Sequence, residues 1–152
     1  GTSIVYRPKF LRPRTGGVFN LFEVSDVPIA VIKMFPGISP KLFEVLISSG
    51  VKAIVIEAFG AGNIPAKASL SEVLCEAKRR GVVIVVTSQC GRGNVELGTY
   101  AASSQLLSAG AVSGHDMTTE AVVAKVMWAL PQSATAAEFS KLFYTPIGND
   151  MI

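Results

Sequence analysis

The sequence has no long hydrophobic run. Hydrophobic residues make up 49% of the 152 residues and charged residues only 16%, but no uninterrupted apolar stretch approaches the roughly 18 residues of a membrane-spanning helix. No signal-peptide pattern stands at the N-terminus. A membrane partner is therefore not expected. The length suits one domain with its own core, since about 150 residues bury roughly 70% of the unfolded surface on folding.

Cysteine and histidine are scarce. Cys75 and Cys90 are too far apart to form a Cys-x-x-Cys pair, and His115 is the only histidine. A structural zinc site needs about four such ligands at short spacings, so no metal is expected. Two scattered cysteines are typical of free thiols in a reducing compartment, which predicts a cytoplasmic protein.

Acidic residues are missing from the first 22 positions, where Arg7, Lys9, Arg12 and Arg14 stand. Without these four, the 14 basic residues fall to ten, against 11 acidic ones. A short basic arm can touch phosphate. The rest of the chain, however, has no basic helix and no aromatics interleaved with basic residues. No nucleic-acid partner is expected.

Neither glycine-rich loop completes a dinucleotide-binding fingerprint. Pro65 replaces the third glycine after the pair Gly60 and Gly62, and Glu96 replaces it after Gly91 and Gly93. That glycine permits the close packing of helix and strand in the Gly-x-Gly-x-x-Gly motif. No cofactor is expected.

From Pro28 onward the chain alternates apolar, β-branched runs with helical patterns. Strands are predicted over residues 29–35, 51–57 and 82–86, and helices over 39–50, 69–81, 100–108, 118–130 and 135–144, with a break at 110–114. This order predicts one small three-layer α/β/α domain over 28–152, with a flavodoxin-like or Rossmann-like parallel sheet of about four strands.

Local signals mark the helix starts. Ser39 and Pro40 fit an N-cap and a first-turn proline, and Ser69 with Glu72 predicts a capping box. The second helix should bury an apolar stripe at i, i+3, i+4 and i+7, formed by Leu70, Val73, Leu74 and Ala77. Residues 1–27 lack this rhythm; they are predicted to be a linker, with an edge strand over 18–24.

Polar motifs follow two of the predicted strands, where parallel sheets bind ligands. Gly60 and Gly62 free the backbone beside the amide of Asn63; the simpler interpretation is a tight turn in which Asn63 satisfies its own backbone. Cys90 follows the next strand. As a nucleophile it would need His115 as its base, whereas the simpler interpretation makes it a small packing residue.

The segment from Asp116 to Glu120 has the pattern of a helix start. Thr118 or Thr119 can cap free amides, while Asp116 and Glu120 lie near the positive end of the helix dipole. This structural role accounts for every polar residue of the segment. A carboxylate pair for acid–base catalysis is the weaker hypothesis.

Taken together, these motifs resemble the C-terminal domain of L-asparaginases of the cytoplasmic, type I kind. The resemblance covers about residues 35–130 and is carried by segments 34–38, 59–65, 88–95 and 114–121. It implies hydrolysis of L-asparagine to aspartate and ammonia by a threonine nucleophile, supported by a second threonine, an aspartate and a lysine. In that family all four belong to an N-terminal domain, so this chain is expected to contain no catalytic residue and to be inactive alone. The Thr15-Gly16-Gly17-Val18 segment departs from the family's Thr-Gly-Gly-Thr-Ile motif and is treated as a chance match.

The resemblance also implies partners and site residues. The C-terminal domain of the family completes a neighbouring subunit's active site, so Asn63, Gly62 and Gly60 are candidates for substrate binding in a dimer or a dimer of dimers. Glu57, Gln89 and Cys90 are candidates for a regulatory asparagine site, although a carboxylate at Glu57 would repel the carboxylate of that ligand. The implied partners are L-asparagine and the N-terminal domain that precedes the linker.

Two alternatives stay open at this stage. One is the corresponding domain of a glutamyl-tRNA amidotransferase amidase subunit, which Trp128 in the final long helix also suits, although the Asn63 loop fits type I asparaginases better. The other is a stand-alone module that binds a small molecule or a protein.

Overall fold

The computed structural model describes residues 16, 21–22, 24–98, 103–147 and 150–151. Four parallel strands form one sheet in the order β1-β2-β3-β4, with bounds Ile29–Lys33, Ala53–Ala58, Val83–Ser88 and Val112–Ser113. The helices are α1 (Pro40–Ser48), α2 (Ala68–Arg79), α3 (Ser104–Ser108), α4 (Thr119–Ala129) and α5 (Ala136–Phe143). The predicted α/β class with a four-stranded parallel sheet is confirmed.

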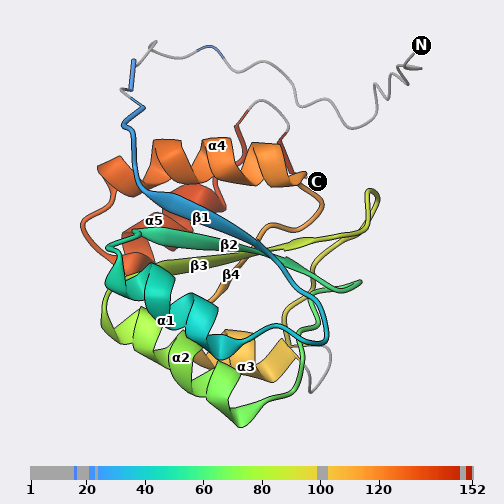
Figure 1. The fold of residues 1–152 in the computed structure, drawn as a ribbon. Coiled ribbons are helices and arrows are strands. Elements are labelled where there is room, and N and C mark those ends of the chain that lie inside the picture. The colour runs from blue at the N-terminus through green and yellow to red at the C-terminus, as the bar shows by residue number, and fades with distance from the viewer. Residues whose placement is uncertain (1–15, 17–20, 23, 99–102, 148–149, 152) are drawn as a thin grey trace.

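The sheet is the middle of three layers. Helices α1, α2 and α3 lie on one side and α4 and α5 on the other (Figure 1). In β2, Ile54 and Ile56 join the core under α1 and α2, whereas Ala53 and Val55 join the core under α4 and α5. Both faces of the strand are therefore buried, which explains its continuous apolar run.

Helix α2 shows one success and one error of local prediction. It buries Leu70, Val73, Leu74 and Ala77, as the spacing predicted. The predicted capping box at Ser69 and Glu72 is wrong, because the helix begins at Ala68 and the carbonyl of Lys67 accepts its first helical bond, from the N–H of Ser71 at 3.1 Å. Ser69 thus lies inside the first turn, where its side chain cannot cap.

Strand ends also shift. β1 ends two residues before the predicted Phe35, β2 and β3 each begin and end slightly later than predicted, and β4 lies where a break was predicted. β4 pairs only Val112 with Val85 and Ser113 with Val86. Two residues are too few to show a period in the sequence, and it is the neighbouring β3 that makes them a strand.

Two predicted segments lie partly outside the described residues. Residues 18–20 and 23 of the predicted edge strand are not described, and Leu21, Phe22 and Val24 form no strand. Residues 100–102 of the predicted helix over 100–108 are not described either, and α3 begins at Ser104.

Candidate functional site

The carboxyl ends of β2 and β3 meet the start of α4. Parallel strands end at the same edge of a sheet, so the loops that follow them converge. A pocket of about 240 Å³ lies between these segments. We call it the strand-end pocket; it is lined by Glu57 of β2, by Ser88, Gln89, Cys90, Gly91 and Gly93 at and after the end of β3, and by Asp116, Met117, Thr118, Thr119 and Glu120.

Gln89 and Glu57 are held in place by hydrogen bonds. The Nε2 of Gln89 donates to the carbonyl oxygens of Met34 at 2.7 Å and of Glu57 at 2.8 Å, which ties the ends of β1 and β2 together. The Oε1 of Glu57 accepts from Thr119 Oγ1 at 2.7 Å. Gln89 therefore positions the pocket wall, and Glu57 is oriented by α4.

Cys90 is exposed at the mouth of the strand-end pocket. Its backbone N–H donates to Ser88 Oγ at 3.0 Å, and Ser88 Oγ donates to the carbonyl oxygen of Gly60 at 2.6 Å. His115 is not among the pocket residues; its ring lies against Tyr144, with the ring centroids 5.5 Å apart. The pocket thus presents the Cys90 thiol without the base that a cysteine nucleophile requires.

The start of α4 brings carboxylates and a capped helix terminus to the pocket. Thr118 Oγ1 accepts from the N–H of Ala121 at 3.3 Å, which confirms Thr118 as the N-cap. Hydrogen bonds from the backbone of Glu120, and then from Thr118, hold the pKa of the Glu120 carboxyl below its ordinary value. Glu57, Asp116 and Glu120 make the pocket acidic, and no lysine or arginine is among the described residues that line it.

Asn63 closes a turn after β2 and is not among the residues that line the strand-end pocket. Its backbone N–H donates to the carbonyl of Phe59 at 2.9 Å, and its carbonyl accepts from the N–H of Phe59 at 2.9 Å. Gly60 and Gly62 have positive φ values of 48° and 108°, which glycine adopts most readily. Within the described chain, Asn63 Oδ1 is buried and lacks a hydrogen-bond partner.

The unpaired oxygen argues against the simpler interpretation of Asn63. An Asn that only formed a turn would use its side chain on its own backbone, whereas here the backbone alone closes the turn. Leaving a buried acceptor unpaired costs about 1–3 kcal/mol. Among the described residues, no hydrogen bond accounts for the position of Asn63 Oδ1.

The structure divides the predicted site residues into two groups. Glu57, Gln89 and Cys90 meet in the strand-end pocket, whereas Asn63, Gly62 and Gly60 form the separate turn. Thr119 is a pocket residue that the sequence did not single out. Thr119 was explained as a cap, and only the contact with Glu57 across 62 positions shows its other role.

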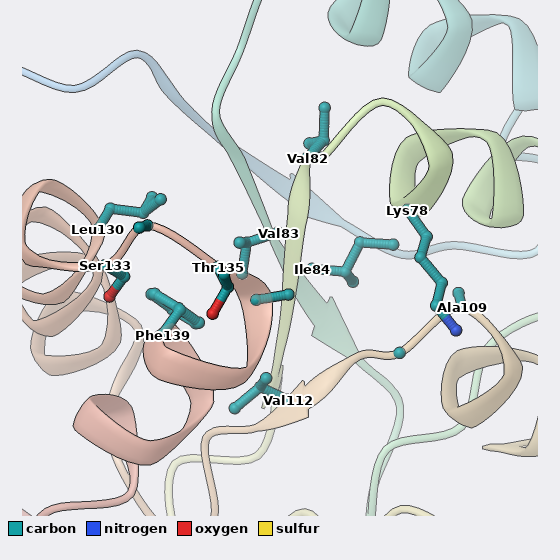
Figure 2. Close-up of a pocket in the computed structure, with 14 residues that line it drawn as sticks. Lys78, Val82, Val83, Ile84, Ala109, Val112, Leu130, Ser133, Thr135 and Phe139 are labelled. Atoms are coloured by element: carbon teal, nitrogen blue, oxygen red, sulfur yellow. The ribbon is translucent and has the colours of Figure 1, made fainter.

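A second hollow, of about 270 Å³, lies at the amino-terminal end of β3 (Figure 2). Phe139 and Leu130 flank it on one side, and Lys78 and Ala109 on the other. Its lining includes no Asp, Glu, His or Cys. Lys78 is its one ionisable lining residue among those described, and its Nζ donates to the carbonyl oxygen of Ser108 at 3.2 Å.

The part of the chain that is described contains neither a cluster of metal-ligating side chains nor a membrane-spanning helix. No three His, Cys, Asp or Glu side chains there gather closely enough to hold a metal ion. None of the helices there is both long and apolar enough to cross a bilayer.

Comparison with known proteins identifies the family. The profile of the glutaminase/asparaginase C-terminal domain matches residues 28–143. The chain belongs to this family. L-asparaginase 1 of Escherichia coli K12 is 35% identical over 120 residues, which cover 79% of this chain and 36% of that protein. A glutamyl-tRNA(Gln) amidotransferase subunit of Methanobrevibacter smithii is 38% identical over 134 residues, which cover 86% of this chain and 30% of that protein.

Solved structures agree with this assignment. L-asparaginase I of Vibrio cholerae superposes with a TM-score of 0.83 at 35% identity, over 90% of this chain and 41% of that one. The L-asparaginase of Thermococcus kodakarensis gives 0.82 at 33% identity, over 93% and 43%. The predicted resemblance to an asparaginase C-terminal domain is thus confirmed. This asparaginase C-terminal domain spans about a third of the length of the curated relatives it matches.

Proposed function

We propose that this asparaginase C-terminal domain takes part in the hydrolysis of L-asparagine to aspartate and ammonia, together with an N-terminal domain that supplies the threonine nucleophile. The family match over residues 28–143 carries the proposal. The fold similarity to two L-asparaginases supports it. The free cysteines are consistent with action in the reducing cytoplasm.

Asn63 is the residue that we assign to substrate binding. Its buried, unpaired Oδ1 sits on a turn fixed by the positive φ values of Gly60 and Gly62. In a homo-oligomer, dimer or dimer of dimers, the Asn63 side-chain amide would hydrogen-bond the charged groups of a substrate bound to the neighbouring protomer. A rigid turn at the end of a central strand suits that task, because it holds the acceptor in place before the ligand arrives.

The strand-end pocket is our candidate for a regulatory amino-acid site. Its carboxylates, Glu57 above all, would bind the ammonium group, and the positive end of the α4 dipole would attract the carboxylate. Gln89 would hold the end of β2 in place beside Glu57, and Cys90 would lie at the entrance of the strand-end pocket. This orientation removes the repulsion that a ligand carboxylate would meet beside Glu57.

A second candidate function is a role in a glutamyl-tRNA amidotransferase. One observation favours it: a component of such an enzyme is 38% identical over 134 residues, a longer match than that to L-asparaginase 1. An asparaginase releases ammonia from free asparagine without tRNA. An amidotransferase would show its activity only with glutamyl-tRNA and its other component.

The test uses the protein with its upstream sequence in place. We expect ammonia release from asparagine, and we expect Asn63→Ala to lower kcat/KM roughly tenfold to a hundredfold, because a hydrogen bond to a charged group is worth about 1.5–3 kcal/mol. The matched control is Asn94→Ala, which removes an exposed amide whose only partner among the described residues is Glu96, at 3.3 Å. Normal kinetics in Asn63→Ala with a large fall in Tm would show that Asn63 is only a turn residue. No release from asparagine would refute the asparaginase assignment.

A further inference from the structure

The turn that carries Asn63 is held at its corner by a side chain from the neighbouring strand. Ser88 is the last residue of β3, and its Oγ donates to the carbonyl oxygen of Gly60 at 2.6 Å, across 28 positions of the sequence. Among the described residues, no backbone N–H donates to that carbonyl. The Ser88 hydroxyl is therefore the hydrogen-bond donor that fixes this corner.

The Gly60 corner needs such a contact because its backbone is intrinsically free. Gly60 and Gly62 both have positive φ values, and glycine also populates other backbone conformations at little cost. The hydrogen bonds between Phe59 and Asn63 close the two ends of the turn, but they do not involve the Gly60 carbonyl. The conformation of the turn, and with it the direction of the Asn63 side chain, thus depends in part on the bond from Ser88.

The loop after β3 fixes the Ser88 hydroxyl in turn. The backbone N–H of Cys90 donates to Ser88 Oγ at 3.0 Å, so the single hydroxyl proton is directed to Gly60. Gly93 packs directly on Ser88: an added Cβ there would lie 2.6 Å from Ser88 Cβ and closer still to its Oγ. The φ of Gly93 lies outside the left-handed region, so the close approach to Ser88 is what requires glycine at this position.

We propose that Ser88 is a positioning residue for Asn63, and that Gly93 keeps the Ser88 hydroxyl within reach of Gly60. Ser88 touches no substrate in this arrangement. It acts by holding the turn in the conformation that directs the Asn63 amide. Ser88 thus deepens the proposed substrate-binding role of Asn63, on which this assignment rests.

The first test measures ammonia release from asparagine by the protein with its upstream sequence in place. Ser88→Ala should lower kcat/KM roughly three- to tenfold, the range that the loss of one neutral hydrogen bond gives. Ser49→Ala is the matched control, because it removes a hydroxyl that donates to the carbonyl of Leu46 at 2.8 Å at the end of α1, and it should leave kcat/KM unchanged. Parental kinetics in Ser88→Ala would overturn the assignment.

A double-mutant cycle shows whether Ser88 acts through Asn63. Ser88 also lines the strand-end pocket, and the cycle separates its effect on Asn63 from an effect on that pocket. In the Asn63→Ala background, Ser88→Ala should lower kcat/KM by less than about twofold further, because the side chain that it positions is already gone. Two effects that simply multiply would contradict the assignment.

The side-chain amide signals of Asn63 give a readout that does not need activity. In NMR spectra of the 152-residue chain, these signals are identified by their loss in Asn63→Ala. They should shift in Ser88→Ala and stay in place in Ser49→Ala. If the parent protein releases no ammonia, the proposed function fails, and the amide signals still decide whether Ser88 positions Asn63; unchanged signals in Ser88→Ala refute it.

Gly93→Ala tests the same contact from the other side. The added methyl group should displace the Ser88 hydroxyl, so it should lower kcat/KM and shift the Asn63 amide signals in the same direction as Ser88→Ala does. Gly37→Ala is the control, since an added Cβ there meets no heavy atom closer than 3.8 Å and the φ is not left-handed. Gly93→Ala with the kinetics and the amide signals of the parent would mean that the loop after β3 does not hold the turn.

Discussion

Single residues shape the Asn63 turn, and Gly62 matters most among them. Its φ is 108°, and an added Cβ would lie 3.0 Å from Val95 Cγ1 and 3.4 Å from Leu97 Cδ2. Both the backbone conformation and the available space therefore require glycine. Val95 and Leu97 belong to a loop that is hydrogen-bonded to the Asn63 turn: the N–H of Glu96 donates to the carbonyl of Ala61 at 3.0 Å.

Gly62→Ala should therefore lower the free energy of unfolding by about 1–3 kcal/mol, the typical cost of a strained backbone conformation. Gly91→Ala is the control, since no heavy atom lies within 4 Å of an added Cβ and φ is not positive there. It should leave stability unchanged or raise it by about 0.4–1 kcal/mol. Urea unfolding of both variants decides the matter, and equal midpoints would contradict the role given to Gly62.

Helix caps show how elements differ from their sequence signals. The capping box belongs to α5, where the N–H of Glu138 donates to Thr135 Oγ1 at 3.2 Å and Glu138 Oε2 accepts from the N–H of Thr135 at 3.2 Å. Ser69 and Glu72 have the same spacing but no such bonds, because α2 begins one residue earlier. A capping-box sequence thus forms the capping hydrogen bonds only where its serine or threonine is the N-cap residue of the helix.

Thr135→Ala should cost about 1 kcal/mol of stability through the lost cap. Ser69→Ala should change stability by less than about 0.5 kcal/mol, as surface substitutions usually do. Thermal and urea unfolding of the two variants, measured side by side, test this order. A larger loss in Ser69→Ala would contradict Lys67 as the N-cap of α2.

At the scale of the whole molecule, the C-terminal residues are fixed to the second core. Met151 is 8% exposed within the cluster under α4 and α5. Asp150 joins this core through Lys125 Nζ at 2.6 Å, and its Oδ1 accepts from the N–H of Ile147 at 2.8 Å. The ion pair therefore connects the end of the chain to the helix that begins at the strand-end pocket.

Lys125→Met should lower stability by about 3 kcal/mol, the low end for a broken buried pair, because Asp150 keeps some contact with water. The double variant Lys125→Met with Asp150→Asn should recover much of the loss, since no charge is then left alone and the amide oxygen can still accept from Ile147. Chemical denaturation of the single and double variants measures the difference. A single variant as stable as the parent would show that the pair contributes nothing.

Local sequence patterns were enough to predict the elements whose residue types depend directly on burial or on backbone conformation. The apolar runs around Ile54 and Val85 predicted buried parallel strands, the stripe from Leu70 to Ala77 predicted the buried face of α2, and two glycines before Asn63 predicted a turn. These patterns are local, because burial and backbone conformation restrict which residue types occur at neighbouring positions of the sequence. The family motifs in the same loops pointed to an asparaginase C-terminal domain before any fold was known.

Features that depend on residues far apart in the chain emerged only in the folded molecule. β4 is a strand because β3 lies beside it, and Thr119 belongs to the pocket because its hydroxyl meets Glu57. Nothing in the sequence signalled that Lys125 turns inward to Asp150. Such pairings depend on contacts between distant segments, and no local pattern of residues encodes them.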